Sequence, residues 1–244
     1  MWTRSNLKES AKAAFRNNYW ICVLVSLVIS FLLGTGASVG SSGATQSSSP
    51  TGREIALATL LMLAGFALTV CVVNPLRVGG TRFFVVNDSE KAEFSELGHA
   101  FSHNYGKVIS TMLLKDVFLT LWAFLLIVPA IIKSYSYRMV PYILAEDPDL
   151  GATEVIKKSQ EMMKGNKWDA FLLDLSFLGW ALLGIITLGI VSIFWVSPYK
   201  NQTDAELYLA IKDNVEGVNI ADDYNSSYYN VDSQESFEPI QPLD

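Results

Sequence analysis

The sequence has few charged residues, and this shortage is the first guide to its class. Charged side chains make up 17% of the 244 residues, against about a quarter in a typical soluble domain. No basic residue follows Lys212, so the net charge of −6 hides a mildly basic body and an acidic tail. A basic patch on a soluble module, the usual mark of nucleic-acid binding, is missing. We therefore expect no nucleic-acid partner.

Cysteine and histidine are also scarce, with two of each. Cys22 and Cys71 lie in apolar runs, where cysteine usually serves as a small packing residue. His99 and His103 are one helical turn apart but lack the partners of a metal site. The sequence also has no nucleophile elbow, zinc-protease motif or phosphate-binding loop. We therefore expect no catalytic, cofactor or metal site, and a protein that is not an enzyme.

Long apolar runs are what the chain has in abundance. Half of its residues are hydrophobic, and four runs can be read as membrane helices, at residues 19–33, 54–73, 108–148 and 168–198. The predicted fold class is therefore all-α, a polytopic transmembrane helical bundle with up to six passes and with cytoplasmic amphipathic helices.

Two further boundaries divide the chain. A Gly/Ser-rich stretch at about residues 34–53 predicts a flexible outer loop. Residues 1–212 then form a helical membrane domain, and residues 213–244 form a disordered, acidic cytoplasmic tail. Both termini are expected to be cytoplasmic, in a multi-pass protein of the cell membrane.

The central run is too long for one crossing and is interrupted by Pro129 and Pro141. A single outward crossing would leave Lys133, Arg138 and the lysines of residues 157–167 outside, against the positive-inside rule. We therefore favour a chain that turns back near Pro129, with one long kinked helix as the alternative. For residues 168–198, a tilted crossing and a re-entrant hairpin both stay open.

Several short amphipathic helices are expected beside these runs. Residues 5–18 begin at a Ser5 N-cap, and a break is expected at Asn74-Pro75. Apolar faces are predicted on the first helix, on the one ending near Gly165 and on the one at 203–212. Their members are Leu7, Ala11, Ala14, Phe15 and Tyr19; Val155, Ile156, Met162 and Met163; and Ala205, Leu207, Tyr208 and Ile211.

Ionisable residues inside apolar runs are the candidate functional positions, because burying a charge in lipid costs a few kcal/mol. They are Lys115, Asp116, Lys133 and Asp174. Lys115 and Asp116 are adjacent and point to different helix faces, so we expect that they do not pair simply. A buried Lys115–Asp174 pair is one hypothesis, and four side chains that snorkel at the interface are the alternative.

Several segments in order resemble a known family. They include SNLKESAKAAFRNNYW, NPLRVGGTRFF, SYSYRMVPYILAEDPDLGATEVIKKSQEMMKGNKW, DLSFLGW and TLGIVSIFWVSPY with TDAELY. Over about residues 5–209 the sequence resembles the bacterial membrane family catalogued as domain of unknown function 975. Its layout is also similar, more weakly, to the membrane domain of some glycerophosphodiester phosphodiesterases. The resemblance implies an integral plasma-membrane helical bundle and supplies no catalytic residue.

These features predict a non-enzymatic scaffold or accessory subunit. Its partners would be the lipid bilayer and a protein held by the acidic tail or the cytoplasmic helices. A small transporter, channel or lipid-handling protein is the alternative, with the intramembrane charges lining a cavity. The alternative requires a polar cavity that contains Lys115 or Asp174, whereas a scaffold requires a dry core.

Overall fold

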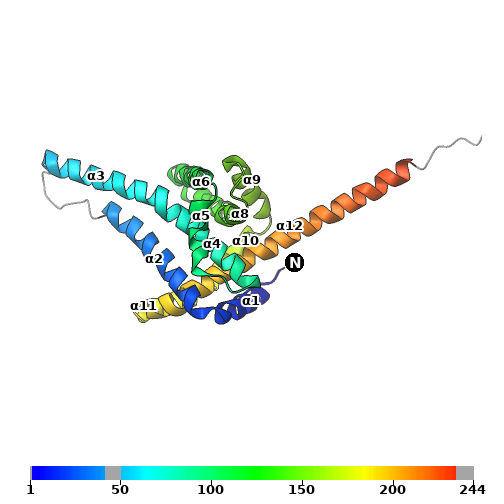
Figure 1. Ribbon diagram of the computed structural model, residues 1–244, viewed down its shortest axis with the longest axis horizontal. Coiled ribbons are helices and arrows are strands. Elements are labelled where there is room, and N and C mark those ends of the chain that lie inside the picture. The colour runs from blue at the N-terminus through cyan, green and yellow to red at the C-terminus, as the bar shows by residue number, and fades with distance from the viewer. Residues whose placement is uncertain (1, 42–50, 235–244) are drawn as a thin grey trace, which may run out of the picture.

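The computed structural model describes residues 2–41 and 51–234, and the regular elements in this part of the chain are all helical. This confirms the all-α fold class (Figure 1). The α-helices are α1 Arg4–Asn17, α2 Tyr19–Ser41, α3 Gly52–Leu68, α4 Asn74–Ser89, α5 His99–Ser102, α6 Tyr105–Leu125, α7 Ile127–Ser136, α8 Val140–Glu146, α9 Ala152–Met162, α10 Lys167–Leu175, α11 Leu178–Ile186 and α12 Ser197–Gln234. A 3-10 helix, η2, covers Phe94–Gly98, and π-helical turns cover η1 Thr69–Val73 and η3 Ser192–Val196.

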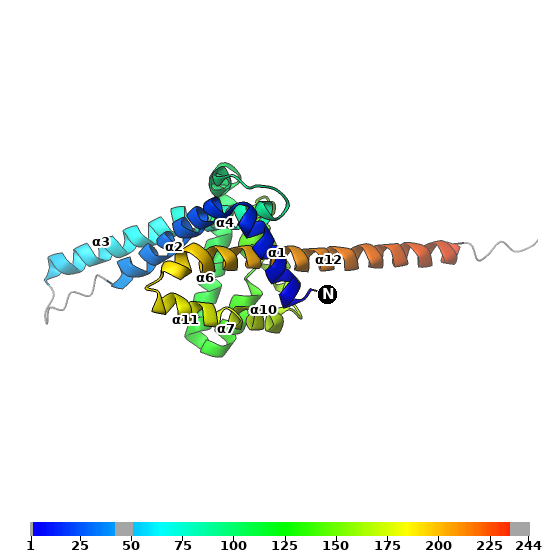
Figure 2. The ribbon, with the colours of Figure 1, turned by 90° about the horizontal axis from the view of Figure 1, so that it is seen from below.

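Three helical hairpins project from a packed centre. They are formed by α2 with α3, by α6 with α7, and by α11 with η3. In Figures 1 and 2 the pair α2–α3 extends to the left while α12 leaves on the opposite side, and in Figure 2 the pair α6–α7 points downward. The hairpin ends therefore lie away from the direction in which α12 leaves.

The turn-back in the central run is confirmed, two or three residues before the expected place. Leu126 adopts an extended backbone conformation between α6 and α7. Pro129 lies in the first turn of α7, where its missing N–H costs no helical hydrogen bond. The Lys133 amine is 5.3 Å from the Trp122 ring centroid, which shows that the returning helix lies against α6. The alternative of one long kinked helix is therefore wrong.

The last apolar run also folds back as a hairpin, so of the two alternatives left open the single tilted crossing of the whole run is wrong. Leu188 and Gly189 both have positive φ, and the Gly189 N–H donates to the Gly184 carbonyl at 2.8 Å. Gly184 lets η3 approach α11 closely, because a Cβ at this position would lie 2.0 Å from the Ser192 Oγ. At the open end of this hairpin, the Phe177 and Tyr199 rings pack with centroids 5.4 Å apart.

Four boundaries differ from the prediction. The first helix starts one residue early, with Thr3 as its N-cap instead of Ser5. The helix from Tyr19 continues to Ser41, into the expected outer loop, whose residues 42–50 lie outside the described residues. The expected break at Asn74-Pro75 is absent, because the π-helical turn η1 carries the helix on into α4. Helix α12 runs to Gln234, beyond the boundary expected at Lys212.

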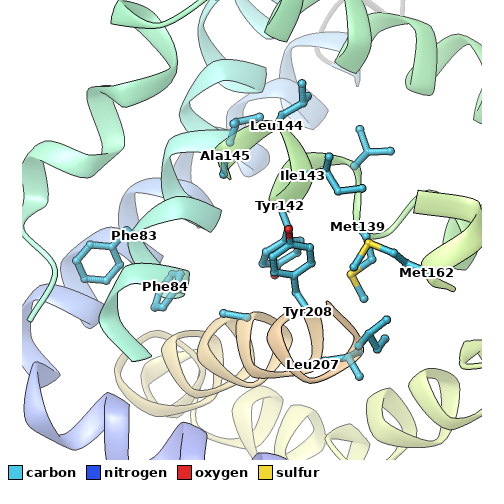
Figure 3. Close-up of a cluster of buried hydrophobic side chains, with 14 of the residues drawn as sticks. Phe83, Phe84, Met139, Tyr142, Ile143, Leu144, Ala145, Met162, Leu207 and Tyr208 are labelled. Atoms are coloured by element: carbon cyan, nitrogen blue, oxygen red, sulfur yellow. The ribbon is translucent and has the colours of Figure 1, made fainter. Parts of the chain in front are cut away.

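The core lies where α4, α8, α9 and α12 meet. Figure 3 shows Phe84, Tyr142, Met162 and Leu207 directed toward one another from these four helices. The apolar faces predicted for the helix ending near Gly165 and for residues 203–212 are confirmed, since all eight side chains are buried. Four of the five predicted for the first helix are buried as well, and Tyr19 packs against the core.

The hairpins, by contrast, expose apolar side chains. Phe124 is 87% exposed and Leu188 93% exposed, each beside a turn. Three described helices are long and apolar enough to cross a membrane, namely Gly52–Ser89, Tyr105–Leu125 and Lys167–Ile186. A fourth arises if α1 and the start of α2, which meet at 103°, count as one bent span. The hairpins therefore lack the polar outer surface of a soluble bundle.

Candidate functional site

Two prolines that follow π-helical turns lie at the base of the hairpins, which is the end joined to the packed centre. Proline lacks an N–H, so the carbonyl four residues earlier loses its helical partner. The Tyr105 hydroxyl donates to the carbonyl of Cys71, four residues before Pro75, at 2.6 Å. In the same way the Tyr19 hydroxyl donates to the carbonyl of Phe194, four residues before Pro198, at 3.0 Å. Each hydroxyl thus links one helical hairpin to another.

A cluster of charges lies at this base. Arg138, in the turn between α7 and α8, bonds both Asp174 carboxylate oxygens, each at 2.9 Å. Its guanidinium also donates to Asp204 of α12 at 2.8 Å. Lys200, one helical turn before Asp204, bonds Asp174 at 2.9 Å and Asp204 at 2.5 Å. The Tyr135 hydroxyl donates to Asp174 at 2.9 Å. We call Arg138, Asp174, Lys200 and Asp204 the charge cluster.

The charge cluster is partly shielded from solvent. The Arg138 side chain is 14% exposed, and those of Lys200 and the two aspartates are between 20% and 31% exposed. A two-pronged guanidinium–carboxylate bond fixes both distance and orientation. Because each carboxylate faces two cations, the arrangement neutralises charge and joins α7, α10 and α12. It leaves no free carboxylate for acid–base chemistry.

The hypothesis of a Lys115–Asp174 pair is wrong, because Asp174 is held by Arg138 and Lys200. Lys115 is buried on α6, and its amine lies 3.1 Å from the Asp116 carboxylate. The expectation that these neighbours do not pair is therefore also wrong. A long lysine side chain can curl back to the next residue even though the two Cβ atoms point apart. Asp116 also accepts from the Asn74 amide at 3.3 Å.

Lys133 lies apart from both groups. Its amine faces the Trp122 ring across the α6–α7 hairpin, a cation–π contact. The four candidate residues therefore occupy three separate places, and the structure does not bring them together as one site. In the described part of the chain, no group of three or more His, Cys, Asp or Glu side chains could hold a metal ion.

A pocket of about 210 Å³ adjoins the charge cluster, between α2, α4, α8 and α12. Arg138 and Asp204 border it on one side, and Arg77 of α4 borders it on another. Its lining residues are Ile29, Arg77, Gly80, Thr81, Phe84, Arg138, Pro141, Tyr142, Asn201 and Asp204. Lys115 and Asp174 are not among them.

A second cluster of polar side chains, separate from the charge cluster, is buried on the side of the core that faces α1. The Asn87 amide donates to the Gln202 carbonyl oxygen at 3.1 Å and to the Ala14 carbonyl at 3.2 Å. Glu206, one helical turn after Gln202, is 7% exposed and shares a hydrogen bond with Asp88. Burial, with a further contribution from Asp88, raises the pKa of Glu206 to about 8. At neutral pH Glu206 is therefore protonated and donates to Asp88.

Sequence reasoning missed most of these residues. Arg138 entered only the argument from the positive-inside rule, and Lys200, Asp204 and Arg77 are not among the candidates because none lies inside an apolar run. A usable signal was available in two similar segments, Asn74-Pro75-Leu76-Arg77 and Ser197-Pro198-Tyr199-Lys200. In each, a proline at the end of an apolar run is followed two residues later by a base.

Replacing Asp174 with Asn should destabilise the fold. The change leaves Arg138 and Lys200 with one carboxylate between them, and breaking a pair this well shielded should cost about 1–3 kcal/mol. The readout is the midpoint of thermal unfolding in mild detergent. The control is Glu161→Gln in the exposed Lys157–Glu161 pair, which should cost at most about 0.5 kcal/mol. Equal midpoints for the two variants would contradict the role given to Asp174.

Glu206 should make stability fall as pH rises. Its folded pKa lies above the ordinary value of 4.5, so the folded state holds the proton more tightly than the unfolded state. The stabilisation is full below about pH 4.5 and is lost as pH rises through about 8, by at most about 1.4 kcal/mol per pH unit. Glu206→Gln should flatten this slope, because the amide cannot ionise. Thermal midpoints between pH 5 and 8 test this, and Glu161→Gln should keep the wild-type slope.

Comparison with known proteins gives one match. Residues 125–215 match the family model described as "Protein of unknown function (DUF975)". No curated protein and no solved structure matches the chain. The matched segment holds the whole charge cluster together with Tyr142, while Arg77 lies before it. Over residues 125–215 the chain is therefore similar to the family of proteins of unknown function DUF975.

Proposed function

We propose that the protein is a multi-pass protein of the bacterial plasma membrane that acts as a non-enzymatic scaffold or accessory subunit. Support for membrane insertion comes from the exposed apolar side chains of the hairpins, such as Phe124 and Leu188. In water they would form an aggregation-prone surface, whereas in lipid they cost nothing. Both termini lie in the cytoplasm, because the basic α1 and α9 then face the inner surface.

The scaffold role rests mainly on the saturation of Asp174. The transporter alternative requires Lys115 or Asp174 in a polar cavity, and Asp174 is instead bonded by Arg138, Lys200 and Tyr135. The core beside it is filled by aromatic and aliphatic side chains (Figure 3). A packed centre with a helix that leaves it on one side is suited to holding a partner protein at the membrane.

The alternative of a lipid-handling protein is favoured by one observation. The pocket beside the charge cluster combines two guanidinium groups with apolar walls from Ile29 and Phe84. Such a lining suits an anionic headgroup. This function would use the same membrane location and the same fold.

Cysteine labelling should reveal the orientation. On a background with Cys22→Ala and Cys71→Ala, Glu161→Cys should be protected from a membrane-impermeant maleimide in intact cells. Thr51→Cys, between α2 and α3, should be labelled. Permeabilised cells provide the control, since both cysteines should then react. The reverse pattern would overturn the proposed topology.

The scaffold role predicts a complex that depends on the acidic end of the chain. A protein ending at Lys212 should stay in the membrane but migrate in a smaller complex on native gels than the full chain. The matched control replaces the acids after Lys212 with Asn and Gln, which keeps the length and removes the charge. Unchanged complex size for both variants would contradict a partner held by the tail.

A further inference from the structure

Arg77 is a charge without a counter-ion in the part of the chain that the structure describes. It lies half-buried in the first turn of α4 and borders the pocket. Within the described residues, no ion pair or hydrogen bond joins its guanidinium to a carboxylate. Its charged neighbour Lys115 repels it, and Asp116 is held by Lys115 and Asn74. A guanidinium shielded in this way is stabilised when an anion binds to it.

The charges around the pocket do not balance. The charge cluster has two cations, Arg138 and Lys200, and two carboxylates, Asp174 and Asp204, which neutralise one another. Arg77 adds a third cation to the lining of the pocket. One bound negative charge therefore balances the three cations and two carboxylates around the pocket, and its place is beside Arg77.

Tyr142 supplies a second, independent observation. Its side chain is 7% exposed, and it lines the same pocket from α8. Its ring stacks on Tyr208, which fixes the direction of the hydroxyl (Figure 3). Among the described residues this hydroxyl has no hydrogen-bond partner, and its oxygen is open to the pocket because it is not one of the enclosed, unsatisfied polar atoms. A donor that lines the pocket without a protein acceptor indicates a ligand with oxygen acceptors.

We propose that this pocket binds a phosphate group, with Arg77 supplying the charge and Tyr142 a hydrogen bond. Phosphate oxygens match the planar fork of a guanidinium and accept from hydroxyls. The volume of about 210 Å³ lies below the 300–1,000 Å³ of pockets for drug-sized molecules. It suits the phosphate of a lipid headgroup or a small soluble phosphate.

The position along the helix favours the lipid source. Arg77 follows Pro75 by two residues, where the apolar part of the helix that begins at Gly52 ends. If that helix crosses the bilayer, Arg77 lies at the depth of the lipid phosphates. This step depends on the membrane location proposed above, whereas the binding chemistry of Arg77 and Tyr142 does not.

The test measures ligand-induced thermal stabilisation of the full chain purified in mild detergent. The probes are short-chain phosphatidylglycerol, inorganic phosphate, and a short-chain diacylglycerol that lacks the phosphate. The variants are Arg77→Gln, Arg77→Lys and Tyr142→Phe, with Lys158→Gln as an exposed basic control on α9. The shift of the midpoint with ligand concentration gives an apparent Kd for each.

The wild type and Lys158→Gln should be stabilised by phosphatidylglycerol and not by the diacylglycerol. Arg77→Gln should weaken the apparent affinity at least tenfold and Tyr142→Phe about threefold to tenfold, with Arg77→Lys between them and the wild type. Without ligand, Arg77→Gln should be no less stable than the wild type, because it removes the repulsion with Lys115. If Arg77 had only a structural role, Arg77→Gln would be less stable than the wild type without ligand.

Two results would overturn the proposal. One is equal stabilisation of Arg77→Gln and the wild type, and the other is equal stabilisation by the diacylglycerol. If Arg77→Gln fails to fold, Tyr142→Phe decides in the same way. A response to inorganic phosphate alone keeps the anion site and assigns it to a soluble phosphate. Carbonate washing of membranes tests the membrane location separately, since loss of the wild type from the membrane would refute the location while leaving the binding result intact.

Discussion

The bond between Arg138 and Asp174 holds the architecture together. Arg138 follows the α6–α7 hairpin, and Asp174 precedes the turn that leads into α11. Helices that face lipid gain little from burying apolar surface against one another, because the lipid tails are equally apolar. A two-pronged ion pair at the base of two hairpins supplies the specific attachment that apolar contacts cannot. Lys200 and Asp204 extend the same attachment to α12.

The two tyrosine hydroxyls at the hairpin bases solve a related problem. Pro75 and Pro198 each free a backbone carbonyl close to an apolar run, where an unsatisfied carbonyl would be costly. Tyr105 and Tyr19 reach these carbonyls from neighbouring hairpins. The prolines therefore create bonds between elements in place of bonds within one helix. Such bonds add direction to packing that is otherwise made of interchangeable apolar side chains.

Local periodicity predicted the amphipathic helices well and the connections less well. The buried faces of α1 and α9 follow from spacing alone, because each helix packs one side on the core. The turn-back at Leu126 followed from the distribution of basic residues around Lys133. The continuous helix through Pro75 could not be predicted, since its π-helical turn depends on the distant Tyr105. Partners of charged residues were missed for the same reason, because Arg138 and Asp174 are far apart in sequence.

The prolines and the charged residues both lie at the base of the hairpins, and this shared position has a physical cause. Arg77 and Lys200 each follow a proline by two residues, and Pro141 lines the same pocket as Arg77. A backbone with free carbonyls is tolerated only where donors are available, and charged side chains are tolerated only where they find partners. Both requirements are met where apolar hairpins end and a polar layer begins. A site for an anion is therefore expected here, beside Arg77, to which the described residues offer no carboxylate.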